Sequence, residues 1–310
     1  MHFHSRAGAR RGALAGLLLA ALLVPHASRA DDPKFNFGKE EDLKKLPPWS
    51  ASITAGFGLT TGNAQSLNLT GGGNVAYRFD GVNLLTLDGN VALQRSTIET
   101  ATDLDGNGVI GPGEVQSITQ SVSEAWGVRL RYDRFFGFNS IYAFGFAGGD
   151  VPAGKQFVGG GQVGYSRALW KTATSELVGE AGLDYTFQRY VVGDPNTLNI
   201  AALRFFLGYL GTPNPDLQYN ASVEYLGNLN TLDSPTGKLN AFADNRLVGR
   251  LGVTWKIFGD GSLGFRFRAL YDSAPAPKPP PAGFAWAPGY QPLAKEWDTF
   301  TELVLVYKLL

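Results

Sequence analysis

The sequence predicts an all-β protein, a closed antiparallel transmembrane β-barrel of about twelve strands. Three observations predict it: long segments that alternate apolar and polar residues, connections that alternate in length, and no long apolar run after residue 30. A period of two marks a strand with two unlike faces. Segments of about 9–11 residues are long enough to cross a bilayer as tilted strands.

The first hairpin, residues 49–80, has the clearest alternation. Its first strand places Trp49, Ile53 and Phe57 on one face, with serine, threonine and glycine on the other. After the turn Thr61-Gly62-Asn63 the alternation resumes. Strands in soluble proteins average about 5–6 residues, and these two are longer. Ten further segments are strand-like: 83–96, 116–132, 140–149, 156–169, 176–190, 199–210, 217–228, 245–258, 262–272 and 297–309.

The connections sort by parity along the chain. The even-numbered ones are short: 80–82, 135–139, 170–175, 211–216 and 259–261. The longest odd-numbered ones are 97–115, 229–244 and 273–296. Outer-membrane barrels combine short periplasmic turns with long outer loops, whereas a soluble barrel or sandwich has no reason to do so. We therefore expect a Gram-negative outer membrane, with its lipid against the apolar face.

Aromatic residues gather near the strand ends on the apolar face, where they are expected to form interfacial girdles. They are Trp49, Tyr77, Phe79, Tyr132, Tyr185, Phe187, Tyr225, Trp255, Tyr271, Trp297 and Tyr307. No water satisfies backbone groups in hydrocarbon, so the sheet has to close.

Residues 1–30 are predicted to be a signal peptide. Arg6, Arg10 and Arg11 precede a short apolar core, and small residues occupy the cleavage site at Ala30. Residues 31–48 are expected to form a periplasmic lead-in, and residues 49–310 the barrel. Removal of the peptide leaves 23 basic against 27 acidic side chains, which does not support binding to nucleic acid.

All three histidines lie within residues 1–30, and the chain has no cysteine. A Ser-His-Asp phospholipase in a barrel needs an imidazole base, and a zinc protease needs imidazole ligands. We therefore expect a protein that is not an enzyme.

Residues 103–114 match the twelve-residue EF-hand calcium loop. Asp103, Asp105 and Asn107 occupy positions 1, 3 and 5, Val109 offers its carbonyl at position 7, and Glu114 stands at position 12. This set predicts one Ca²⁺ ion, bound weakly because no second hand accompanies the loop. A solvated Asp- and Gly-rich outer loop is the alternative.

The polar faces of the predicted strands carry charges of both signs. They are Arg78, Asp88, Arg129, Arg131, Glu180, Asp184, Arg204, Glu224, Arg250, Arg266, Arg268, Asp272 and Glu302. These side chains line either a pore that selects solutes or a lumen filled by ion pairs, because buried charges need partners. The sequence leaves both interpretations open.

Several short motifs resemble the salt-induced outer-membrane protein family, Gram-negative β-barrels without an assigned function. They are Trp49, Gly56 and Thr61-Gly62-Asn63 in the first hairpin, the segment Tyr132-Asp133-Arg134-Phe135, and Asp298-Thr299 before the last strand. The resemblance implies a fold and a location and supplies no catalytic residues.

The expected function is that of a non-enzymatic, porin-like envelope protein. It is either a narrow channel for small polar solutes or a stress-related structural barrel, inserted by the barrel assembly machinery. The alternatives are an adhesin-like surface binder that uses its long outer loops and a soluble β-barrel binding protein.

Overall fold

The computed structural model describes residues 47–60, 65–101, 115–151, 153–235, 237–279 and 293–309. The predicted signal peptide, most of the lead-in and the predicted calcium loop lie outside these residues. No helix within them is long and apolar enough to span a membrane.

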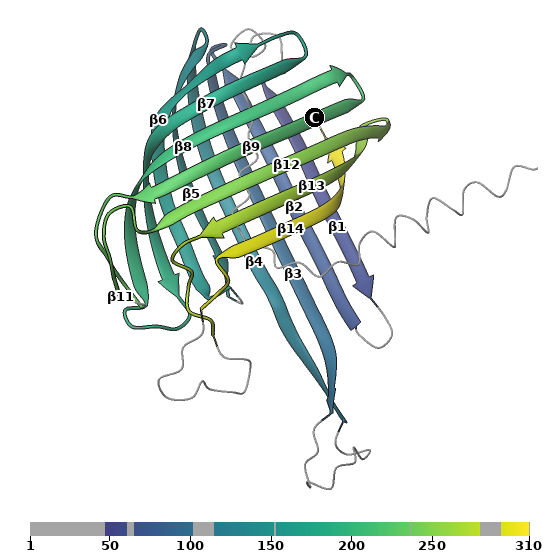
Figure 1. Ribbon diagram of the computed structural model, residues 1–310. Helices are drawn as coiled ribbons and strands as arrows, with labels where there is room; N and C mark the ends of the chain where they lie inside the picture. The colour runs from purple at the N-terminus through teal and green to yellow at the C-terminus, as the bar shows by residue number, and fades with distance from the viewer. Residues whose placement is uncertain are drawn as a thin grey trace, which may run out of the picture.

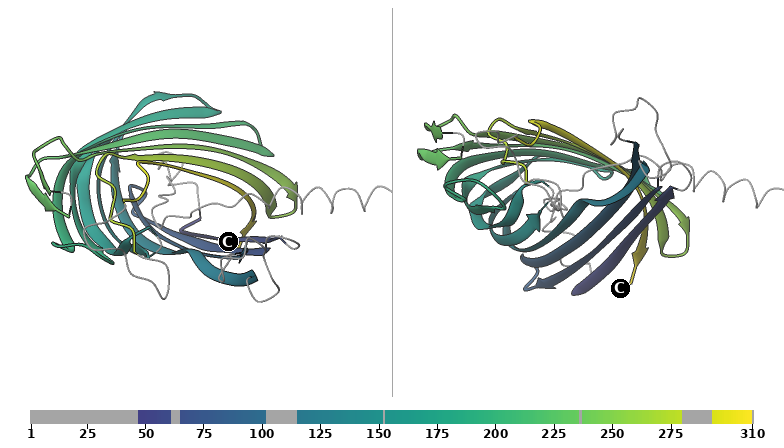
Figure 2. Two further views of the ribbon diagram at one scale, coloured as in Figure 1. Left: turned by 60° about the horizontal axis from the view of Figure 1, so that its bottom comes forward. Right: turned by 90° about the horizontal axis from the view of Figure 1, so that it is seen from below.

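The fold is a closed antiparallel barrel of twelve strands, which confirms the predicted fold class (Figures 1 and 2). The wall strands are β1 (Trp49–Thr60), β2 (Gln65–Phe79), β3 (Asn83–Ala101), β4 (Val115–Phe136), β5 (Asn139–Asp150), β6 (Lys155–Lys171), β7 (Ser175–Tyr190), β8 (Thr197–Asn214), β9 (Leu217–Asn228), β12 (Asn245–Phe258), β13 (Gly261–Asp272) and β14 (Trp297–Lys308). Each pairs with its neighbour in the chain, apart from the pairing of β9 with β12 across a long loop and the closing seam between β1 and β14.

The seam between β1 and β14 is the shortest ladder in the wall. Its four residue pairs run from Ser52 opposite Lys308 to Ala55 opposite Leu305. By contrast, β1 pairs with β2 over its whole length. The barrel therefore closes through few backbone hydrogen bonds at one place.

The connections differ from the prediction at two places. β3 and β4 stay paired out to Ala101 opposite Val115, so residues 97–101 and 115 of the expected loop belong to the strands of a hairpin that projects beyond the barrel (Figure 1). Backbone pairing there continues past the apolar alternation that guided the prediction. The expected loop 229–244 contains a small hairpin, β10 (Leu232–Ser234) and β11 (Gly237–Leu239), too short to give a periodic signal.

The outer face is apolar over a height typical of membrane barrels. Trp297 and Tyr307 stand at opposite ends of β14, both exposed on the outer face. Ten residues at about 3.3 Å each, tilted by about 40°, span about 25 Å. Apolar bands of membrane barrels are about 25 Å tall.

At the short-turn end, Trp49, Tyr77, Phe79 and Tyr132 stack in succession along the outer face, with ring centroids 4.3 to 6.4 Å apart. Side chains on this face can bury themselves only against a partner outside the barrel.

The described interior holds mostly polar side chains, with a small apolar cluster of Ala76, Leu84 and Phe135 at the short-turn end and a larger one at the long-loop end. Tyr190, Leu198 and Ile200 of the wall pack there with Leu232 of β10 and Ala276 of the β13–β14 loop. Two long connections therefore fold inward over this end of the barrel.

Candidate functional site in the barrel interior

An unbroken series of ion pairs links five strands inside the barrel. In order its members are Asp133, Arg131, Glu180, Arg204, Glu224 and Arg250, here called the ion chain. The Nη2 atom of Arg131 donates to Asp133 Oδ1 and to Glu180 Oε1, each at 2.7 Å. Each member is at most 9% exposed. Removing one partner of such a pair lowers the stability of the fold strongly, because the other charge is left buried and uncompensated.

Arg204 is the centre of the ion chain. Its Nη1 donates to Glu180 Oε2 at 2.7 Å, and its Nε donates to Glu224 Oε1 at 2.5 Å. The second oxygen of Glu224 accepts from Arg250 Nη1 at 3.2 Å. Two carboxylates therefore share three guanidinium groups, and Arg204, at 1% exposure, is shut off from solvent.

The ion chain joins strands that are not neighbours in the wall. Arg131 lies on β4 and Glu180 on β7, three strands apart in the barrel order. Three strand spacings are about 14 Å along the wall, yet the two side chains touch, so this contact crosses the lumen. At this level the interior between β4 and β9 is filled.

Tyr142 on β5 reaches across two neighbouring strands to the same arginine. Its hydroxyl accepts from Arg204 Nη1 at 2.9 Å, and the Arg131 guanidinium lies 4.3 Å from its ring centroid. Glycines make this reach possible: a Cβ at Gly164 or Gly182 would lie 2.5 or 2.6 Å from the tyrosine oxygen. The ring adds a cation–π contact to the ion chain.

A second contact crosses the lumen nearer the long loops. Lys155 Nζ on β6 lies 3.6 Å from Asp272 Oδ2 on β13, five strands away in the barrel order. Ala276 and Pro277 are buried close by, with the carbonyl of Pro277 against Gly154. The mouth is thus narrowed by one ion pair and one inward-folded segment.

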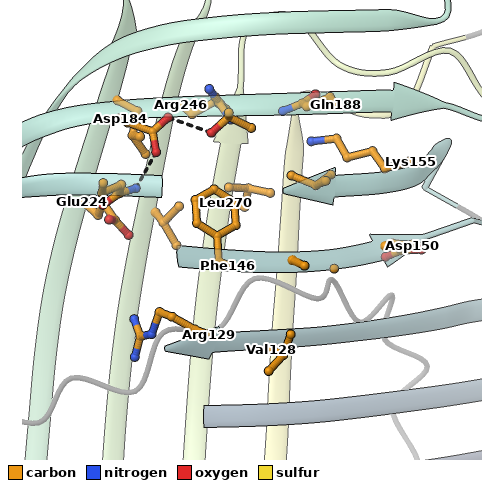
Figure 3. Close-up of a pocket in the computed structure, with 18 of the residues that line it drawn as sticks. Val128, Arg129, Phe146, Asp150, Lys155, Asp184, Gln188, Glu224, Arg246 and Leu270 are labelled. Atoms are coloured by element: carbon orange, nitrogen blue, oxygen red, sulfur yellow. Dashed lines mark hydrogen bonds between the residues drawn. The ribbon is translucent and has the colours of Figure 1, made fainter. Parts of the chain in front are cut away.

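A cavity of about 120 Å³ lies between the ion chain and this second crossing. Figure 3 shows Phe146, Leu270, Arg129, Asp150 and Lys155 among the residues that line it. Its volume far exceeds the roughly 10–15 Å³ that one buried water needs. Its walls also contain Asp184, whose carboxylate accepts from Gln162 at 2.6 Å and Thr186 at 2.7 Å.

The inner face of β1 and β2 contrasts with the ion chain. It carries Ser50, Ser52, Gly56, Thr70, Gly72 and Asn74, here called the small-residue wall, and these residues are partly exposed, whereas Thr54 and Ala76 on the same face are buried. Their outward neighbours Ile53 and Val75 are apolar and exposed. Asn74 donates to Asp88 Oδ1 at 2.6 Å, which ties this wall to Arg129 through the Arg129–Asp88 pair at 2.9 Å. Space beside β1 and β2 is therefore reachable by solvent.

The structure brings most of the predicted interior charges together. Buried in the interior are Asp88, Arg129, Arg131, Glu180, Asp184, Arg204, Glu224, Arg250, Arg268 and Asp272. Arg78 and Arg266 are partly exposed, and Arg78 donates to Ser50 Oγ at 3.1 Å near the short-turn end. Glu302 lies on β14 opposite Arg266, and its side chain is outside the described part.

The predicted calcium ligands Asp103, Asp105, Asn107, Val109 and Glu114 all lie outside the described residues. Within the ranges that are described, no group of three or more acidic side chains could hold a metal ion. The ladder pair Ala101–Val115 brings the two ends of the predicted loop together.

Sequence reasoning missed several residues of the interior. Tyr142 and Phe146 alternate with Ile141 and Ala143, so both faces of β5 are apolar or aromatic. No charged residue among them indicates which face points inward. Lys155 precedes the segment predicted as a strand. Arg246 shares the face of Arg250, so the alternation contained its signal.

Comparisons with known proteins give a family and a fold. A family model described as "Protein of unknown function, DUF481" matches residues 53–282. Among curated proteins none matches the chain. The expectation of an uncharacterised family is confirmed at that level, while the salt-induced name stays a prediction.

Similar solved structures include the NanC porin, at 8% identity and TM-score 0.42, covering 84% of this chain and 100% of that one. The translocator domain of the autotransporter NalP from Neisseria meningitidis has 12% identity and TM-score 0.38, covering 96% of each chain. OmpT of Vibrio cholerae has 9% identity and TM-score 0.36, covering 84% and 96%. Identities this low leave the function to the geometry of this chain.

Proposed function

The chain belongs to the DUF481 family of proteins of unknown function, and we propose that it is a narrow, non-enzymatic channel for small polar solutes in the outer membrane. The observation that carries the proposal is the asymmetry of the lumen. The ion chain fills one side, whereas the small-residue wall on the other side is partly exposed.

The passage we propose runs along β1 and β2. Short hydroxyl and amide side chains such as Ser52 and Asn74 leave space and offer hydrogen bonds to a solute that sheds water. The ion chain keeps the opposite wall rigid, so the passage stays narrow. The long-loop mouth, where Lys155 meets Asp272, is the entrance.

The membrane location is supported by the outer face. Exposed apolar residues alternate with interior ones on all wall strands with described side chains, and aromatic residues mark both ends of β14. An exposed apolar surface of this extent needs a lipid partner.

Single-channel recording in planar bilayers tests the proposal with two adjacent residues of β1. Ser52→Trp places a large ring in the proposed passage and is expected to lower the current. Ile53→Trp places the same ring on the outer face, where the isoleucine is 50% exposed, and is expected to leave the current unchanged. Equal currents from both variants would show that the passage does not run along β1.

A structural barrel is the second candidate, and the complete pairing of the ion chain favours it. A channel that has to open would break these pairs, whereas a structural barrel keeps them. Folded wild-type protein that passes no current under any applied voltage would reject the channel and leave the structural barrel.

The predicted calcium loop is a separate proposal. The pairing of Ala101 with Val115 supports it, because the strand residues on either side of the predicted loop lie opposite each other. Titration calorimetry with Ca²⁺ should give heat from the wild type and none from Glu114→Gln. Equal heats would show that the loop does not bind calcium through Glu114.

A further inference from the structure

We propose that the interior cavity binds a small zwitterion with an apolar body, such as a free amino acid with an aliphatic side chain. This inference goes beyond the proposed channel: no described residue of β1 or β2 lines the cavity, and Asp88 in its wall contacts the small-residue wall through Asn74. It is argued from the signs of the charges, their arrangement around an apolar zone, and the enclosure of the cavity.

The cavity wall carries equal numbers of both charges. Its five cationic side chains are Arg129, Lys155, Arg246, Arg250 and Arg268, and its five anionic ones are Asp88, Asp150, Asp184, Glu224 and Asp272. A wall of zero net charge attracts a simple anion or cation to one set of groups and repels it from the other. Because Arg129 pairs with Asp88, Lys155 with Asp272 and Arg250 with Glu224, a zwitterion can enter such a pair with one of its charges on each partner, whereas a singly charged solute leaves one partner uncompensated.

The charges flank an apolar zone. On the paired strands β12 and β13, Arg246 stands opposite Asp272, Val248 opposite Leu270, and Arg250 opposite Arg268. Along this part of the wall, a charged layer is therefore followed by an apolar layer and then by a second charged layer.

Phe146 and Leu226 also line the cavity. Phe146 of β5 and Leu270 of β13, both labelled in Figure 3, line the same cavity, so the apolar zone includes residues from two separate parts of the wall. Ligand sites in general combine apolar surface with a few placed polar groups. This order of layers fits a solute whose charged groups project from an aliphatic body.

The cavity is bounded on two sides by contacts that cross the lumen. The ion chain lies toward the short-turn end, and the pair Lys155–Asp272 lies toward the long loops. A solute held between them loses much of its water, so each of its charges needs an opposite charge on the protein. Enclosure thus strengthens the discrimination between a zwitterion and a singly charged solute.

Titration calorimetry on the full-length protein in detergent tests the proposal with three probes of similar aliphatic body. L-leucine carries both charges, isopentylamine only the cation, and 4-methylpentanoate only the anion. L-leucine is expected to bind at least about tenfold more tightly than either, which corresponds to about 1.4 kcal/mol. Equal or tighter binding of a singly charged probe would overturn the zwitterion, and no heat from any probe would overturn the site.

A matched pair of variants locates the binding. Leu270→Asn lies in the apolar zone and is expected to weaken leucine binding. Leu251→Asn lies on the outer face of β12, where the leucine is 55% exposed, and is expected to leave binding unchanged. Retained heat-modifiable migration on gels shows that each variant folds. Equal affinities for the two folded variants would place the ligand outside the cavity.

Bilayer recording on the same preparations separates the two proposals. Leucine binding without current would reject the channel and keep the binding site. Current without leucine binding would keep the channel and reject the solute class.

Discussion

The ion chain and the small-residue wall face each other inside one barrel, and they satisfy their polar groups in different ways. In the ion chain, long charged side chains are buried and compensate one another, with Arg204 between two glutamates. On the small-residue wall, serine, threonine, asparagine and glycine need few partners because solvent reaches them. Charge can fill a lumen only where it is paired, and short polar residues leave it accessible.

The largest effect is expected from Arg204→Ala. It leaves Glu180 and Glu224 buried without their shared cation, and breaking a buried pair costs about 3–5 kcal/mol. Denaturant unfolding in detergent should therefore show a much lower free energy of unfolding. Ser52→Ala is the counterpart on the small-residue wall, with an expected change within about 0.5 kcal/mol. A similar loss of unfolding free energy in both variants would contradict this distinction between the two regions.

The next effect concerns the space that glycine leaves for Tyr142. A Cβ at Gly182 would lie 2.5 Å from the carbonyl oxygen of Val163 and 2.6 Å from the tyrosine oxygen. Gly182→Ala should lower the free energy of unfolding by about 3 kcal/mol, since overpacking forces side chains and backbone to shift. Gly249→Ala, with open space around its Cβ, is the control and should unfold like the wild type.

A smaller effect is expected from Tyr142→Phe. The variant keeps the ring over Gly164 and Gly182 but removes the hydroxyl that accepts from Arg204. A hydrogen bond to a charged group contributes about 1.5 kcal/mol at the lower end of its range. Denaturant unfolding should show that loss. An unchanged midpoint would mean that the two glutamates alone hold Arg204.

The smallest effect is expected from Asp244, a buried carboxyl in the loop before β12. Burial raises its pKa, the nearby carboxylate of Asp272 raises it further, and Arg246 and Lys155 oppose the rise. The folded protein therefore disfavours the ionised form, and stability is lost as pH rises through the folded pKa.

Asp244→Asn should raise the melting temperature at pH 7, and the advantage should shrink as pH falls toward the ordinary pKa of aspartate, about 3.9. Thermal unfolding at the two pH values measures this difference. A variant less stable than the wild type at pH 7 would show that Asp244 is paired as effectively as the carboxylates of the ion chain.

The sequence predicted the wall better than the interior. Alternation locates strands because it reflects two local environments, and the bounds of β7 and β9 agree with the prediction to within a residue. The cross-lumen contact of Arg131 with Glu180 joins residues 49 positions apart, and no local pattern encodes it. The interior position of Tyr142 was not predicted, because β5 carries apolar and aromatic residues on both its lipid-facing and its interior face. The β10–β11 hairpin is held by the burial of Leu232, a tertiary contact.

The short seam between β1 and β14 has a consequence for folding. Its four pairs join residues about 250 positions apart, so almost the entire chain has to be in place before the seam can form. Contacts of such sequence separation have a high entropic cost and form slowly. Every other wall ladder can grow from a hairpin or across the β9–β12 loop. Until the seam forms, the edges of β1 and β14 remain open for pairing with another chain, so the last step of barrel formation is also the one most exposed to misassembly.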